Sequence, residues 1–162
     1  MMIDKGRMDK PYYKTDTTTL LKGDSLELLK EIARNVIDTR RAIFTEALTH
    51  VCEGNISQAV QVILSNFKLA EGQQDVGNMA NDLVILGNLY LELNQPSKAL
   101  TSFNQSIEVI DKSNLPQAVK VNGHTTHLFN LSRVFAVQGE IEKAKETSDL
   151  FAEQVGIRNN PI

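Results

Sequence analysis

The chain has 162 residues, of which 41% are hydrophobic and 23% charged, and its net charge is −3. This composition is typical of a folded globular domain and excludes a largely disordered chain. The longest basic run is Arg40-Arg41, which is too short to form a patch for phosphates, so we expect no nucleic-acid partner. Because the sequence has no signal peptide, no apolar run of membrane-spanning length and only one cysteine, we expect a cytoplasmic protein without a membrane partner.

The N-terminal part divides into a polar tail and a long helix. Residues 1–22 are polar, and we expect them to be loosely ordered. Asp24 and Glu27 have the spacing of a capping box, and apolar residues then recur every three or four positions. Neither glycine nor proline occurs between residues 25 and 53. The sequence therefore predicts one helix over residues 24–53, with a break near Asp38 as the alternative.

Five further segments have the apolar periodicity of helices, and glycine, asparagine or proline residues separate most of them. No segment alternates with the two-residue period of a strand, so we expect no sheet. The short connections predict that neighbouring helices are antiparallel, in the order helix, tight turn, helix, longer turn. The five predicted helices span residues 56–70, 76–93, 96–112, 117–138 and 141–155.

Three of the connections share one pattern, in which a residue that tolerates positive φ is followed by an apolar residue and then by an alanine. The first residue makes the turn, the apolar residue closes the end of the hairpin, and the alanine lets two helices approach closely. The three copies align without gaps and are Gly54-Asn55-Ile56-x-x-Ala59, Asn94-Gln95-Pro96-x-x-Ala99 and Gly139-Glu140-Ile141-x-x-Ala144.

These repeats resemble the tetratricopeptide repeat family over residues 40–156. The middle unit matches best, through Leu83, Leu86-Gly87, Tyr90, Asn94, Pro96, Ala99, Phe103 and Ser106. The last unit matches through Leu128, Leu131-Ser132, Phe135, Gly139, Ile141 and Ala144, but departs at Ser148 and Phe151. In the first unit, Glu46 and His50 stand in slots that are usually apolar or aromatic. The alanines lie 40 residues (59 to 99) and 45 residues (99 to 144) apart, against about 34 in a typical repeat, which favours the long helices of kinesin-light-chain-like repeats.

The resemblance implies an all-α right-handed superhelix of stacked antiparallel helix hairpins, with about three repeats in residues 23–157 and a C-terminal end at 158–162. A bundle of α-hairpins that carries such turns by chance is the alternative. In the repeat interpretation, small residues hold the helices close together at four positions. These repeat-packing residues are Ala59, Gly87, Ala99 and Ala144.

The resemblance also implies a scaffold that binds a peptide or a partner protein in a concave groove lined by the first helix of each repeat. Asn88 and Asn130 match asparagine slots of the carboxylate clamp found in the family's co-chaperones. Val84 stands where that clamp has a lysine, so we do not expect a complete clamp. The groove residues that we expect in the second and third repeats are Asn81, Val84, Asn88, Leu91, Thr126, Phe129, Asn130 and Arg133.

The sequence carries no pattern that predicts catalysis or a cofactor. It contains no glycine-rich phosphate loop and neither a G-x-S-x-G nor an H-E-x-x-H motif. His124 and His127 share a helical face, but structural zinc needs three or four ligands, so we expect no metal. We interpret Cys52 as a small apolar filler. We therefore expect a protein that is not an enzyme and has no cofactor.

The alternative function is a structural or self-assembling segment. Repeat arrays usually end in a polar cap. The last predicted helix is followed only by residues 156–162, and Pro161-Ile162 resembles the start of a further helix. Apolar residues such as Phe151 and Val155 would then be exposed, either where a longer array continues or where two copies pair end to end. In this alternative we expect a homo-oligomer that forms through the C-terminal repeat.

Overall fold

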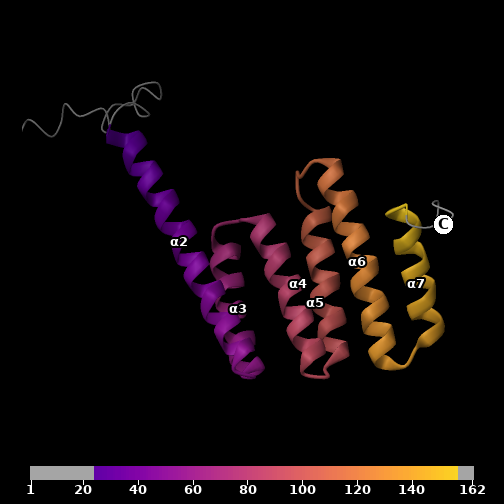
Figure 1. Ribbon diagram of the computed structural model, residues 1–162. Coiled ribbons are helices and arrows are strands. Elements are labelled where there is room, and N and C mark those ends of the chain that lie inside the picture. The colour runs from indigo at the N-terminus through magenta and orange to yellow at the C-terminus, as the bar shows by residue number, and fades with distance from the viewer. Residues whose placement is uncertain (1–23, 157–162) are drawn as a thin grey trace, which may run out of the picture. The chain divides into compact units, whose positions relative to one another are not determined.

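The computed structural model describes residues 24–156, which are helical apart from short connections and contain no strand (Figure 1). The all-α prediction is therefore confirmed for this part of the chain. The predicted tail, residues 1–22, and the C-terminal end, residues 158–162, lie outside the described residues. The helices are α2 (Asp24–Cys52), α3 (Ile56–Gly72), α4 (Val76–Glu92), α5 (Pro96–Asp111), α6 (Gln117–Gln138) and α7 (Ile141–Gln154).

The chain forms two compact units that meet within α2, one ending at Ala42 and the other beginning at Ile43. Helix α2 is continuous across Asp38, so the prediction of one long helix is correct and the alternative with a break is not. The described part of the first unit is the helix over residues 24–42. The second unit contains the end of α2 and all of α3 to α7.

Within the second unit, the helices pack in chain order: α3 on α4, α4 on α5, α5 on α6 and α6 on α7 (Figure 1). Successive helices are antiparallel, as their short connections require. An arrangement in which each element contacts mainly its neighbours in sequence is typical of helical repeats. The structure therefore confirms the predicted all-α architecture, in which helices pack on their neighbours in sequence as in a helical repeat.

The three tight turns have the predicted left-handed residue at their first position. The φ angles are +77° at Gly54, +54° at Asn94 and +77° at Gly139. In each turn, the next amide donates a hydrogen bond to the carbonyl five residues earlier, which caps the end of the preceding helix. These bonds are Asn55 N to His50 O at 2.8 Å, Gln95 N to Tyr90 O at 2.8 Å and Glu140 N to Phe135 O at 2.9 Å.

The connection between α3 and α4 is a fourth turn of this kind, although the sequence predicts a longer one. Gln74 has a φ of +55°, and the amide of Asp75 donates to the carbonyl of Ala70 at 2.9 Å. The Asp75 carboxylate accepts a hydrogen bond from the amide of Asn78 at 3.1 Å, so Asp75 caps α4. The prediction of a longer turn is wrong here because this cap starts α4 directly after the left-handed residue.

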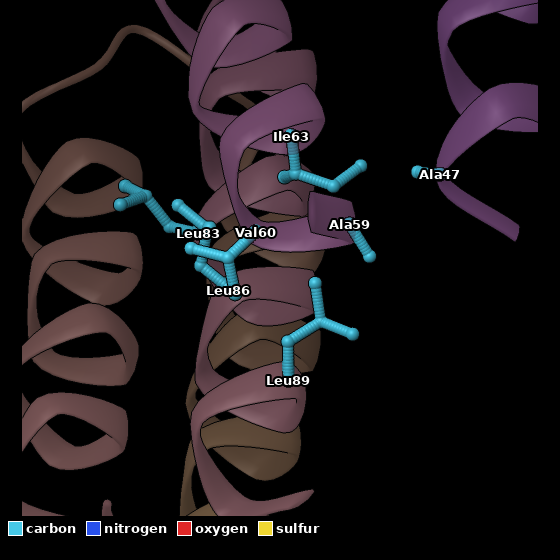
Figure 2. Packing of buried hydrophobic residues seen from close by; sticks show 7 residues of the cluster. All are labelled: Ala47, Ala59, Val60, Ile63, Leu83, Leu86 and Leu89. Atoms are coloured by element: carbon cyan, nitrogen blue, oxygen red, sulfur yellow. The ribbon is translucent and has the colours of Figure 1, made fainter. Parts of the chain in front are cut away.

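The larger core cluster joins the end of α2 to α3 and α4 (Figure 2). Ala59 and Ile63 of α3 are completely buried in it. Figure 2 shows the buried members, which are Ala47, Ala59, Val60, Ile63, Leu83, Leu86 and Leu89. A second cluster, formed by Ala99, Phe103 and Val134, connects α5 with α6.

A buried polar pair connects α3 with α4 beside this core. The Asn66 amide nitrogen donates to both carboxylate oxygens of Asp82, at 2.9 and 3.1 Å. The Asp82 side chain is 2% exposed, so these bonds offset part of the cost of removing the carboxylate from water. The sequence does indicate that Asp82 is buried, because Asp82 lies on the same helical face as the apolar residues Met79 and Leu86.

Small residues set the spacing of the helices in the second unit. A Cβ atom on Gly87 of α4 would lie 2.3 Å from the Phe103 ring of α5, and one on Gly123 of α6 would lie 2.9 Å from Ile110. Of the predicted repeat-packing residues, Gly87 thus faces α5 directly, and Ala59 and Ala99 are fully buried. Ala144 is only partly buried.

The contact between Gly87 and Phe103 can be tested with a matched pair of glycine substitutions. Gly87→Ala should lower the free energy of unfolding by about 1–3 kcal/mol, because the buried ring of Phe103 would have to move. Gly72→Ala is the control: a Cβ there meets nothing within 4 Å, so its effect should be neutral or stabilising by up to about 1 kcal/mol. Urea unfolding measures both, and equal effects would contradict the packing described.

Candidate partner-binding groove

A pocket of about 210 Å³ lies between α4 and α6, with α5 forming its floor. We call it the α4–α6 pocket. Its lining combines apolar side chains with amides and hydroxyls, and His127 is the only titratable residue among residues 24–156 that line it. From α4 come Gly77, Ala80, Asn81 and Val84; from α5 come Phe103, Ser106, Ile107 and Ile110; from α6 come Val119, Asn122, Gly123, Thr126, His127 and Asn130.

Four of the predicted groove residues line this pocket. Asn81 and Val84 come from α4, and Thr126 and Asn130 come from α6. Asn81 and Thr126 are exposed and Val84 is half-buried. The structure therefore brings together residues of α4 and α6 that are about 45 positions apart in the sequence, as the repeat period predicts.

Asn130 is the deepest polar group of the pocket. The residue is 3% exposed, and its side-chain amide has no hydrogen-bond partner among residues 24–156. Because the amide lines this open pocket, it can hydrogen-bond to water or to a ligand that displaces the water. A ligand that offers both a donor and an acceptor could complete this hydrogen bonding.

Asn88 and Arg133 bind each other at the edge of this region. Nη1 of Arg133 donates to Oδ1 of Asn88 at 2.6 Å and so connects α6 with α4. The guanidinium carbon also lies 5.7 Å from the centre of the Phe129 ring, within the range of a cation–π contact. Two of the predicted groove residues therefore have a structural contact with each other.

The other two predicted groove residues also take part in helix packing. Leu91 packs against the cluster of Ala99, Phe103 and Val134, as Val84 does from the wall of the pocket. The Phe129 ring lies 5.4 Å from that of Phe151, which connects α6 with α7. Leu91 and Phe129 thus lie outside the α4–α6 pocket, although they share a helix with its members.

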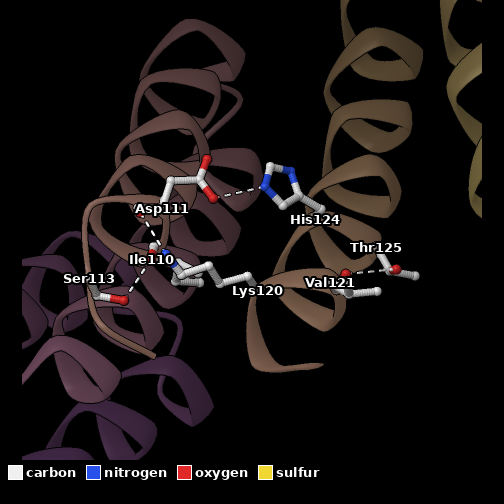
Figure 3. Close-up of polar contacts among 7 residues, drawn as sticks. All are labelled: Ile110, Asp111, Ser113, Lys120, Val121, His124 and Thr125. Carbon is white, nitrogen blue, oxygen red and sulfur yellow. Dashed lines mark hydrogen bonds and ion pairs between the residues drawn. The ribbon is translucent and has the colours of Figure 1, made fainter. Parts of the chain in front are cut away.

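The loop between α5 and α6 is held by polar contacts close to the pocket (Figure 3). Nε2 of His124 lies 2.9 Å from Oδ1 of Asp111, and Nζ of Lys120 donates to the Asp111 carbonyl at 2.8 Å. The Ser113 hydroxyl donates to the carbonyl of Ile110 at 2.6 Å. The contacts of Lys120 and His124 with Asp111 hold the first turns of α6 against the end of α5, and the Ser113 bond holds the start of the loop.

His127, which lines the pocket, has a pKa below its ordinary value. Burial is the main cause, and the neighbouring His124 lowers the pKa further, while Asp111 partly offsets both effects. The sequence predicts that both histidines lie partly exposed on the helix surface, and neither is buried in the structure. His124 is exposed and bound to Asp111, and His127 is half-buried in the pocket.

The described residues also bear on three expectations from the sequence, which concern a metal site, a membrane span and the role of Cys52. No group of three or more His, Cys, Asp or Glu side chains in residues 24–156 is arranged to hold a metal ion. None of the helices over the same range has the length and apolar character needed to cross a membrane. The interpretation of Cys52 as a filler is wrong, because it lies exposed at the last position of α2, beside the first tight turn.

End-to-end pairing of two copies would use the surface of α7, and much of that surface is charged. A shallow depression on this helix is lined almost entirely by charged side chains, with Leu150 as the one apolar member. Phe151 is partly buried by its contact with Phe129, while Val155 is exposed. The charged residues are Glu142, Lys145, Glu146, Asp149 and Glu153.

Sequence reasoning missed the floor of the pocket and the first turns of α6. Phe103 and Ile110 are core-type residues whose sequence context gives no sign of a site. For α6 a signal exists, because Val119, Asn122 and His127 lie at helical spacing from Thr126 and Asn130. Comparison of the chain with protein-family models, curated proteins and solved structures finds no match.

The bond between Asn88 and Arg133 should be visible as a coupling energy. Asn88→Ala and Arg133→Ala should each destabilise the protein, and the double variant should lose about 1 kcal/mol less than the sum of the two, because the shared bond can be lost only once. Urea unfolding of the four proteins measures this coupling. Strictly additive losses would contradict a direct contact.

The lowered pKa of His127 predicts a loss of stability in acid. Above a pH of about 6.5 the imidazole is neutral in both the folded and the unfolded chain, and its stabilising contribution is complete. As the pH falls from there through the lowered pKa, the unfolded chain binds more protons than the folded one, so the free energy of unfolding decreases.

Urea unfolding at a series of pH values across this range measures the effect. His127→Gln should reduce the dependence on pH, whereas His50→Gln, which replaces a histidine of the first hairpin, should retain the contribution of His127. If the wild type and His127→Gln have the same pH dependence, burial of the imidazole has no effect on stability.

Proposed function

We propose that this chain is a tetratricopeptide-like binding module that holds an extended segment of another protein in the α4–α6 pocket. The observation that carries this proposal is Asn130, a residue only 3% exposed whose side-chain amide lines the pocket and makes no hydrogen bond to residues 24–156. In this proposal the module is not an enzyme, and its role is to recruit a partner.

The chemistry of the pocket favours a polypeptide over a charged small molecule. The described residues that line it include no lysine, arginine, aspartate or glutamate, so they offer no counter-charge to a phosphate or an ammonium group. Amide side chains can both donate to and accept from a peptide backbone. Asn81, Asn122 and Asn130 provide such groups around an apolar centre.

The apolar floor suggests how the partner obtains affinity. Phe103, Ile107 and Ile110 line the pocket from α5, and Val84 and Val119 line it from the two walls. An aliphatic or aromatic side chain of the partner would bury its surface against them, at about 25 cal/mol per Å² of apolar area removed from water. The neighbouring amides would then grip the backbone on either side of this anchor.

The helical-repeat architecture supports the same proposal. The three tight turns with left-handed Gly54, Asn94 and Gly139 occur at the positions where the tetratricopeptide resemblance expects them. In such arrays the first helices of successive repeats line the binding surface. Helices α4 and α6 are these first helices in the second and third repeats, and they form the walls of the pocket.

Obstruction of the pocket should abolish peptide binding without affecting folding. Peptides would be selected from a random display library with the complete chain, and their affinity measured for variants. Asn81→Arg and Thr126→Arg place a long charged side chain at exposed positions of the pocket wall, so binding should weaken about tenfold or more.

The matched control is Gln105→Arg, which alters an exposed position of α5 outside the α4–α6 pocket. It should leave the affinity unchanged. Circular dichroism of all variants establishes that the helices are intact. If no peptide is selected, or if the control weakens binding as much as the two pocket variants, the proposed function is wrong.

A further inference from the structure

Among the described residues that line the α4–α6 pocket, His127 is the one whose charge can change near neutral pH. It is half-buried, and it lies one turn after Gly123 and one turn before Asn130 on the same face of α6. That face packs on α5, because a Cβ atom on Gly123 would lie 2.9 Å from Ile110 and 3.5 Å from Ile107. The imidazole is therefore placed between the apolar floor of the pocket and its deepest amide.

Two other ionisable groups among the described residues act on His127, and both lie outside the lining of the pocket. His124 is on the same helix, and Asp111 is at the end of α5. The Asp111 carboxylate is bound to His124 rather than to His127, and Lys120 is bound to the Asp111 carbonyl (Figure 3). The residues of α4 that line the pocket are uncharged, and α7, which packs on α6, contributes none of the lining described.

These surroundings favour the neutral imidazole. Burial is the main cause of the lowered pKa of His127, His124 lowers this pKa further, and Asp111 offsets only part of both effects. Near pH 7 the described lining of the pocket is therefore uncharged. As the pH falls through this pKa, the imidazole binds a proton and the lining gains one positive charge.

An apolar side chain of a bound partner would oppose this protonation. It would displace water from the imidazole, and loss of water costs more free energy for a charged group than for a neutral one. The pKa of His127 should therefore be lower in the complex than in the free module. By linkage, the affinity for such a partner decreases as the pH falls below the pKa of the free module, by at most about tenfold per pH unit because one proton is involved.

We propose that His127 makes the α4–α6 pocket sensitive to acid, so that protonation of its imidazole releases a partner that is anchored by an uncharged apolar side chain. This inference rests on the proposed function, because it requires a polypeptide in the pocket. The amides of Asn81, Asn122 and Asn130 do not titrate in this range, so the response to pH is assigned to His127 alone.

The test needs a partner that does not itself titrate. Peptides are selected with the complete chain at about pH 7.5 from a random library without His, Asp or Glu, and are then synthesised with blocked termini. Isothermal titration calorimetry measures their affinity down to about pH 5, where the wild type should bind about tenfold more weakly. Titrations in two buffers of different ionisation enthalpy should also show that binding releases a proton in the range where the affinity begins to fall.

Three substitutions assign the effect to a residue. His127→Gln should abolish both the pH dependence and the proton release, whatever its affinity at neutral pH. His124→Gln should keep the loss of affinity but move it to higher pH, because a neighbouring positive charge is removed and Asp111 is set free. His50→Gln, a change in the first hairpin outside the pocket, should behave like the wild type. Circular dichroism at each pH establishes that the helices are intact.

The outcomes separate this inference from the proposed function. If no peptide is selected, the proposed function fails and the inference fails with it. If peptides bind but their affinity does not depend on pH, or increases in acid, the proposed function stands and the inference is wrong. It is also wrong if the loss of affinity in acid persists in His127→Gln.

Discussion

The close approach of α5 to both of its neighbours is the constraint on which the binding site depends. Gly87 admits the Phe103 ring against the backbone of α4, and Gly123 admits Ile110 against α6. Because neither glycine has a side chain, α5 can pack closely against both helices. The α4–α6 pocket is the space that this arrangement leaves, with Phe103 and Ile110 as part of its floor.

The packing of α6 on α5 explains why the polar residue Asn130 lies in the pocket. Val134, four residues after Asn130, is completely buried against Ala99 and Phe103, so this face of α6 is fixed by the core. Asn130 is therefore held in the pocket by the packing of its own helix. Its amide makes no hydrogen bond to residues 24–156, so it is available to the backbone of a bound partner.

The sequence by itself determined the helices and most of their turns, because the signals are local. The apolar period marks each helix, and Gly54, Asn94 and Gly139 mark turns because these residue types tolerate positive φ. Gln74 was missed because glutamine carries no such signal. Only the tertiary structure decided which groove residues meet: Asn88 and Arg133 bond across 45 positions, and Asn130 lies in one pocket with residues of α4 and α5. No local pattern records such contacts, since they depend on how tightly separate helices pack.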